Sequence, residues 1–177
     1  MTTNTAIEAG TSAPVGTGVS TLTPSHLVLH CSATVDGRSY SWDAIRRYHV
    51  DTLGWSDIGY HAGVEMVGRR LVMVRGRPWT QQGAHCAAAG RNRDSLGLCV
   101  VGRYDIYPPS PELHRAVCRA LAWICVVAGI APEMISGHRE WDARKTCPGT
   151  AWDLDATRVE VGKLVRHSDV PALAINL

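Results

Sequence analysis

The feature that most constrains the fold is an amphipathic stretch from Ser110 to Gly129, set between apolar runs of strand character. Ser110 can cap a helix, Pro111 suits its first position, and Gly129 can end it. Apolar residues recur between these limits at helical spacing. The predicted buried strands cover residues 26–33, 95–101 and 134–136. Strands that alternate with such a helix predict an α/β domain with helices on both faces of its sheet.

Further elements fill the space between these landmarks. A helix is predicted from Ser41 as cap to about Leu53, with a buried side formed by Trp42, Ile45, Tyr48 or His49, and Leu53. Residues 59–67 and 70–74 are predicted to pair as an antiparallel hairpin around Gly68. A last helix is predicted from Asp153 as cap to about Val165, burying Leu154, Val161, Leu164 and Val165. Asp36-Gly37 indicates a turn.

Length and composition indicate one globular domain. The 177 residues are 45% hydrophobic and 19% charged, which is an ordinary globular balance. Residues 1–22 are rich in Thr, Ser, Gly and Ala and are expected to form a flexible arm, leaving 23–177 as the domain. The formal charge of +2, without a Lys/Arg run, gives no indication of a nucleic-acid partner. The first ten residues lack the basic start and apolar core of a secretory signal, and residues 120–130 are too few to span a bilayer.

The six cysteines form no C-x-x-C pair and no regular framework. Cys99, Cys118 and Cys125 lie in apolar stretches, where a free thiol behaves as a small hydrophobic group. This usage favours synthesis in a reducing cytoplasm over a disulfide scaffold. A bridge between Cys31 and Cys86 is the less favoured alternative.

Three residues far apart in the sequence suggest a metal centre. His30 interrupts an apolar strand just before a small polar stretch, His138 follows Ser136-Gly137, and Cys147 precedes the rigid Pro148-Gly149 turn. Two imidazoles and one thiolate are a zinc ligand set that leaves one coordination position open, as hydrolytic sites require. Taken singly, each has a plainer interpretation: a core histidine, a loop histidine and an inert thiol. Together they predict a zinc hydrolase.

Other polar residues can be assigned to this centre with less support. Tyr60 could hydrogen bond to a developing oxyanion, and Lys145 could present a cation to the polarised carbonyl, with Thr146 as an alternative hydrogen-bonding group. A half-buried strand tyrosine and a solvated loop lysine are the plainer interpretations. His61 follows Tyr60 and should point to the opposite face of its strand. Glu65 and Glu140 are the nearest candidates for a general base, and Glu140 fits a supporting or surface group better.

The long polar segment 76–94 is of a length that usually serves a function. His85 and Asn92 are flanked there by small residues and are predicted to contact substrate at a cleft rim, with Trp79 as a stacking surface. General loop polarity is the alternative. The sequence contains no H-E-x-x-H, no G-x-S-x-G and no phosphate-binding glycine loop, and no pair of carboxylates stands out for glycoside cleavage.

Four segments together resemble a known family. They are L-V-L-H-C-S-A-T around His30, D-I-G-Y-H-A-G-V around Tyr60, G-A-H-C-A-A-A-G-R-N-R-D-S-L-G-L-C-V-V-G from Gly83, and G-H-R-E-W-D-A-R-K-T-C-P-G from Gly137. In this order, over roughly residues 25 to 150, they resemble the zinc-dependent N-acetylmuramoyl-L-alanine amidases that include phage lysozymes and peptidoglycan recognition proteins.

The resemblance implies a central mixed sheet flanked by helices, with zinc held by His30, His138 and Cys147. It also implies that Tyr60 and Lys145 serve amide cleavage, since Lys145 matches the pattern of the phage members. The expected reaction is hydrolysis of the amide between N-acetylmuramic acid and L-alanine in peptidoglycan, by a water that zinc activates. A phage endolysin is the expected setting: a monomer made in the host cytoplasm that reaches the cell wall after release.

Two other functions remain open at this point. A peptidoglycan recognition domain could hold a muropeptide without cutting it, although such domains tend to lose the metal cysteine that Cys147 represents here. Resemblance to phage lysozymes also permits binding to RNA polymerase, which no residue pattern in this sequence supports.

Overall fold

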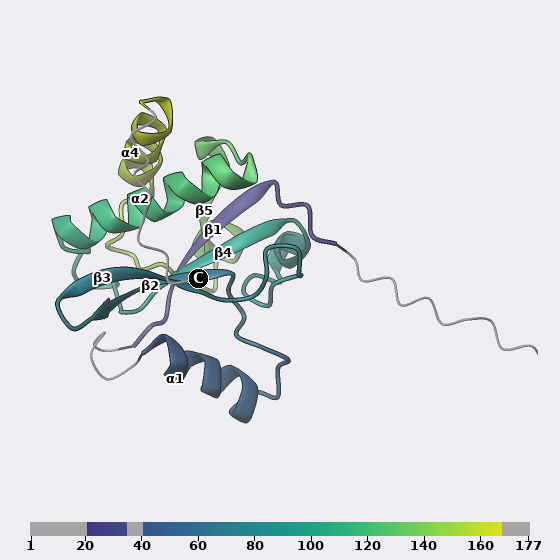
Figure 1. Cartoon of the computed structure of the whole chain (residues 1–177). Helices are drawn as coiled ribbons and strands as arrows, with labels where there is room; N and C mark the ends of the chain where they lie inside the picture. The colour runs from purple at the N-terminus through teal and green to yellow at the C-terminus, as the bar shows by residue number, and fades with distance from the viewer. Residues whose placement is uncertain (1–20, 35–40, 168–177) are drawn as a thin grey trace, which may run out of the picture.

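In the computed structural model, which describes residues 21–34 and 41–167, β1 (His26–Cys31) lies between β4 (Ser95–Val100) and β5 (Ile135–Gly137) (Figure 1). The five-stranded sheet has the order β3-β2-β4-β1-β5 and continues through β2 (Ala62–Val67) to β3 (Arg70–Arg75). Neighbouring strands are parallel except in the β2–β3 hairpin. This confirms the mixed sheet and the α/β class.

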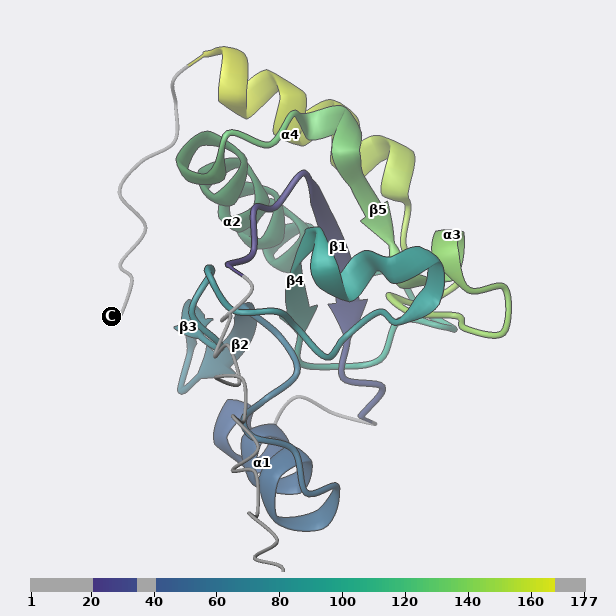
Figure 2. The ribbon, with the colours of Figure 1, turned by 90° about the vertical axis from the view of Figure 1, so that its right-hand side faces the viewer.

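Helices cover both faces of this sheet, as expected. The helical elements are α1 (Trp42–Arg47), the π-helical turn η1 (Tyr48–Thr52), the 3-10 turns η2 (Ala88–Arg93) and η3 (Pro132–Met134), α2 (Pro111–Ala128), α3 (His138–Trp141) and α4 (Leu154–Arg166). α1 lies on one face, and α2 and α4 lie together on the other (Figure 1). Figure 2 shows the same separation from the side, with α3 beside the end of β5.

Two hydrophobic clusters correspond to the two faces. Leu27 and Leu29 of β1 are fully buried in the larger cluster, beneath α2 and α4. The smaller cluster, on the α1 face, contains Trp42, Ile45, Ile58, Cys99 and Val101. Because successive side chains of a strand alternate between faces, His30 turns away from the larger cluster and pairs in register with Cys99. β1 thus places a buried histidine on the face that α1 covers.

The helix predicted between Ser110 and Gly129 forms as α2, within one residue of these limits. The Ser110 hydroxyl accepts a hydrogen bond from the Leu113 amide at 3.2 Å, and Gly129 ends α2 in the left-handed conformation, with φ of 68°. α4 is capped by Asp153 as predicted, and it buries Leu154 and Val161 fully. Leu164 and Val165 pack against the same cluster while partly exposed.

The helix predicted over residues 41–53 differs from the structure. It is α-helical only to Arg47 and continues as a π-helical turn, in which each backbone hydrogen bond spans one more residue than in an α-helix. This wider turn buries His49 and leaves Tyr48 54% and Leu53 42% exposed. The predicted burial of Leu53 was therefore wrong, because the prediction assumed uniform α-helical spacing.

Smaller differences affect strand limits. β2 begins at Ala62 rather than Gly59, so Tyr60 and His61 precede the strand. β5 covers Ile135–Gly137, and Met134 belongs to the turn before it. Leu22 is already buried, and its amide donates to the Thr80 carbonyl at 2.8 Å, so packing starts ahead of Ser25.

Some expectations lie beyond the described residues. The Asp36-Gly37 turn and most of the arm over 1–22 fall outside them, and the domain limits stay a prediction. All six cysteine thiols are free. Within the described ranges, no helix combines the length and apolar character needed to cross a bilayer.

The N-cap of α2 gives a direct test of this packing. Ser110→Ala should lower the free energy of unfolding by about 1 kcal/mol, because the Leu113 amide loses its side-chain acceptor. Ser110→Asp keeps an acceptor next to the helix N-terminus and should retain stability. Urea denaturation of both variants measures the difference, and equal midpoints for Ser110→Ala and the unmodified protein would contradict it.

Candidate metal centre

Two of the three predicted metal ligands are brought together by strand pairing. β1 and β5 are parallel neighbours in which Leu29 pairs with Gly137. The next residues are His30, the last residue but one of β1, and His138, which begins α3. The carboxyl ends of parallel neighbours meet at one edge of a sheet, so the two imidazoles lie side by side, with ring centroids 4.8 Å apart.

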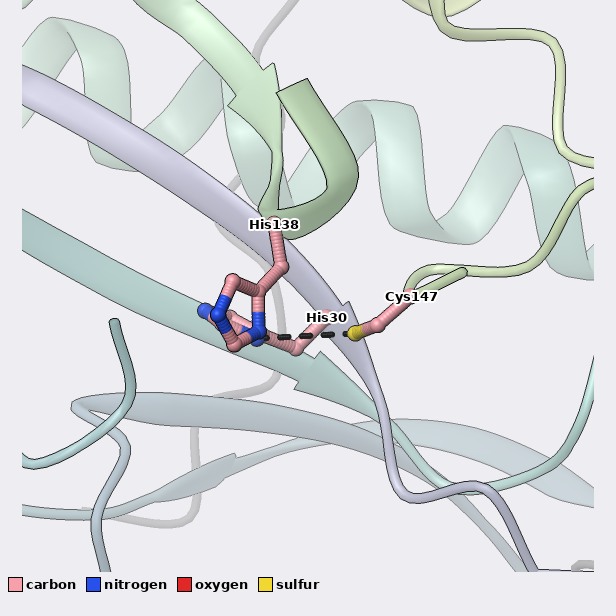
Figure 3. A group of neighbouring side chains, drawn as sticks. All are labelled: His30, His138 and Cys147. Atoms are coloured by element: carbon pink, nitrogen blue, oxygen red, sulfur yellow. Dashed lines mark hydrogen bonds between the residues drawn. The ribbon is translucent and has the colours of Figure 1, made fainter. Parts of the chain in front are cut away.

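Cys147 completes this group from the segment between α3 and α4. Figure 3 shows its thiol pointing toward the two histidine rings. The Cys147 carbonyl accepts from the Arg139 amide at 2.8 Å, and the Arg139 guanidinium donates to the carbonyls of Gly149 and Trp152. Arg139 thereby holds the loop against α3. It was not identified from the sequence, although its place directly after His138 is a signal that could have been used.

The distances among these donors fit a tetrahedral zinc ion. The ligand atoms of His30, His138 and Cys147 all lie within 4.8 Å of one another, and His30 Nδ1 is 3.5 Å from Cys147 Sγ. Zinc bonds of about 2.05 Å to nitrogen and 2.3 Å to sulfur, at a tetrahedral angle, require a separation of about 3.6 Å. Among the described residues, no fourth histidine, cysteine or carboxylate joins the group. The donor set therefore matches a three-ligand site with an open position.

The electrostatic surroundings prepare the imidazoles as ligands. Burial, with His85 and His138 nearby, lowers the pKa of His30 well below its usual value. Burial and the Lys145 ammonium lower the pKa of His138. Both rings are therefore neutral near pH 7, which is the form that binds a metal.

The Cys147 thiol, unlike the two imidazoles, must lose a proton before it can bind a metal. The Cys31 amide donates to Cys147 Sγ at 3.1 Å, which favours a thiolate. A hydrogen bond with the Cys31 thiol, together with burial, nevertheless raises the pKa of Cys147 well above its usual value. A cation is needed to ionise this side chain near neutral pH, since a coordinating thiol loses its proton to the metal.

The two predicted catalytic residues flank this group. The half-buried Tyr60 ring lies 5.2 Å from the His30 ring, centroid to centroid. Burial and the Cys99 and Cys147 sulfurs raise the pKa of Tyr60, so the phenol keeps its proton. Lys145 is exposed, and its charge acts on His138. The Thr146 side chain instead interacts with Asp105 and, after Arg103, contributes to lowering the pKa of that carboxyl.

The residues predicted to contact substrate lie behind the metal group or on the opposite face of the sheet. His85 is only 7% exposed and sits behind His30, where burial, with a smaller contribution from His61, lowers its pKa to about 3. Asn92 directs its side-chain oxygen to the amides of His85 and Cys86. Trp79 packs edge to face on Trp123 of α2, in the cluster on the opposite face of the sheet. His85 is thus buried behind a predicted ligand, and Trp79 lies on the other face of the sheet from the metal group, so their contact with substrate stays a prediction.

The carboxylates are also accounted for. Glu65 accepts from the Trp42 amide at 2.7 Å, and Glu140 accepts from the Gly137 amide at 2.8 Å and pairs with Arg158. Glu140 therefore supports the turn that presents His138, as a supporting group would. His61 turns away from Tyr60, as predicted: its Nδ1 accepts from the Gly97 amide at 2.9 Å, beneath the loop.

Comparison with known proteins gives a consistent picture. A family model described as N-acetylmuramoyl-L-alanine amidase matches residues 20–150. A human protein named N-acetylmuramoyl-L-alanine amidase is 37% identical over 110 residues, covering 61% of this chain and 18% of that protein. The endolysin of Enterobacteria phage T3 is 35% identical over 83 residues, covering 47% of this chain and 51% of that protein. The chain thus spans less than a fifth of the human relative and about half of the phage relative.

A solved structure shares the fold. The N-acetylmuramoyl-L-alanine amidase LysC from Clostridium intestinale superposes with a TM-score of 0.65 and 20% identity, covering 79% of this chain and 86% of that chain. At this identity the likeness is one of fold.

Metal binding can be tested at His138. His138→Ala should abolish the rise in melting temperature that zinc gives the unmodified protein, because two donors remain of three. At a zinc concentration about 100 times the dissociation constant, that stabilisation amounts to about 2.7 kcal/mol. His167→Ala, at the exposed end of α4, is the matched control and should keep the full rise. A full rise in His138→Ala, measured by differential scanning fluorimetry, would exclude His138 as a ligand.

Proposed function

Because the chain belongs to the N-acetylmuramoyl-L-alanine amidase family, we propose that it hydrolyses the amide between N-acetylmuramic acid and L-alanine in peptidoglycan, with zinc as its cofactor. The observation that carries the proposal is the group of His30, His138 and Cys147, whose donor spacing fits zinc and leaves one position open. A domain that only binds the wall has no need of this set.

Zinc at this position would supply a Lewis acid for the scissile carbonyl and make a water more acidic. Residues of the chain would stabilise the negative charge that develops on the substrate's carbonyl oxygen. Tyr60 keeps its proton because its pKa is raised, so it can donate a hydrogen bond to the oxyanion. Lys145 adds a positive charge beside His138 from the exposed side, where substrate approaches. Tyr60 and Lys145 would thus stabilise the transition state whose charge a bound zinc would also offset.

Similarity to the T3 endolysin supports a phage endolysin as the biological setting. In this proposal the protein is made in the cytoplasm of a bacterial host and acts as a monomer on the cell wall after release. No observation on the described residues supports a second role on RNA polymerase.

The reaction can be identified from its products. Purified sacculi treated with the protein should release new L-alanine amino termini, and no new reducing sugars should form. A chelator should stop the release and added zinc should restore it. New reducing ends would indicate a glycosidase instead. Binding to sacculi without any cleavage, in the presence of zinc, would indicate a recognition domain.

The second catalytic group can be identified by comparing neighbouring residues. Lys145→Ala should lower kcat on muropeptides by about 10²–10³-fold, the usual effect of losing one group that stabilises an oxyanion. Thr146→Ala should leave kcat nearly unchanged, since its side chain is uncharged and interacts with Asp105. Zinc content measured in both variants confirms that the metal is retained. A larger loss in Thr146→Ala than in Lys145→Ala would reverse the assignment.

A further inference from the structure

Behind the metal group lies a second imidazole contact that the proposed reaction does not use. His30 directs Nδ1 toward Cys147, and its other nitrogen, Nε2, is 3.0 Å from Nδ1 of His85. Both rings are buried, with His30 1% and His85 7% exposed. When a metal occupies Nδ1 of a neutral imidazole, the proton must sit on Nε2. His30 then donates, and His85 Nδ1 can only accept.

The His85 ring occupies a space that two glycines leave open. A Cβ atom at Gly97 would lie 2.7 Å from Cγ and Cδ2 of His85, and one at Gly83 would also collide with Cδ2. Neither glycine adopts a positive φ, so space and not backbone conformation explains the missing side chains. The His85 ring therefore packs directly against the backbone of both glycines.

The backbone that carries His85 is held as firmly as its ring. The Asn92 side-chain oxygen accepts from the His85 amide at 2.8 Å and from the Cys86 amide at 2.7 Å. On the far side, His61 bonds to the Gly97 amide and to the Gln81 carbonyl, both at 2.9 Å, and meets the His85 ring edge to face. Residues 83–92, which we call the His85 loop, are thus held in place by contacts on either side of the His85 ring.

We propose that His85 is a positioning residue that fixes the tautomer and orientation of His30 for zinc, through the His30 Nε2–His85 Nδ1 hydrogen bond. Groups that accept from a ligating histidine keep its ring aligned and strengthen it as a donor; a carboxylate, a backbone carbonyl or water usually fills this place. Here a neutral imidazole does. His85 acts through His30 and does not touch substrate. The inference rests on the proposed zinc cofactor.

Two variants at this position separate the hydrogen bond from the space it fills. His85→Leu removes the acceptor, whereas His85→Asn places an amide oxygen close to where Nδ1 lies. Zinc affinity, measured by competition with a chelating dye, should weaken about 10–100-fold in His85→Leu. It should recover substantially in His85→Asn. The visible spectrum of the cobalt-substituted protein should change in His85→Leu and return toward the original in His85→Asn.

His49 provides the matched control. Its ring is likewise buried, and its Nδ1 accepts a hydrogen bond from the Gly59 amide at 3.1 Å, but the ring makes no hydrogen bond with a metal ligand. His49→Leu should lower the melting temperature without zinc and leave both zinc affinity and the cobalt spectrum unchanged. If His85→Leu behaves like His49→Leu, His85 is merely structural and the proposal is overturned.

The outcomes for the two proposals are distinct. Tight zinc binding by the unmodified protein, weakened by His85→Leu and recovered by His85→Asn, supports the role of His85 even if sacculi stay intact. Intact sacculi in that case contradict only the amidase proposal. Failure of the unmodified protein to bind zinc contradicts both.

Discussion

The site depends on the parallel pairing of β1 with β5, two short strands separated by more than 100 residues of sequence. Their register sets Leu29 opposite Gly137, and the next residue after each of these two is a histidine. A shift of one residue would turn one imidazole to the opposite face of the sheet, because strand side chains alternate. The metal group therefore inherits its geometry from backbone hydrogen bonds, while Arg139 brings the Cys147 loop to the same point.

The two faces of β1 have different roles: one contributes to the hydrophobic core and the other carries a predicted metal ligand. Leu27 and Leu29 lie in the cluster beneath α2 and α4, which supplies most of the buried apolar surface. His30 faces the other side, where the smaller cluster and the His85 loop enclose it. Several polar groups on that side make hydrogen bonds that offset their burial: His30 with His85, His61 with Gly97, and Glu65 with Trp42.

Local sequence determined the parts of the fold that local physics controls. The caps at Ser110 and Asp153, the buried strands and the turn at Gly68 were all predictable from side-chain chemistry within a few residues. The π-helical turn after Arg47 was not, because no residue there marks a change of hydrogen-bond spacing. The short α3 was also missed, since four residues carry no periodic signal.

The candidate site shows the same division. Its metal group was predictable because a few residue types bind zinc and their motifs are distinctive. The role of His85 was not, because its partner His30 lies 55 residues away and a polar loop looks the same whether its side chains face solvent or a metal ligand. Burial alone separated these two interpretations. The packing of Trp79 on Trp123 was equally hard to predict, because an aromatic ring suits a substrate surface and a core equally well.

The account is tested most directly by X-ray absorption at the zinc edge on the protein loaded with one equivalent of zinc. It predicts two nitrogen donors at about 2.0–2.1 Å, one sulfur at about 2.3 Å and one further light donor from solvent. A first shell without sulfur, or one filled by four protein donors, would contradict the three-residue centre on which the proposed chemistry depends.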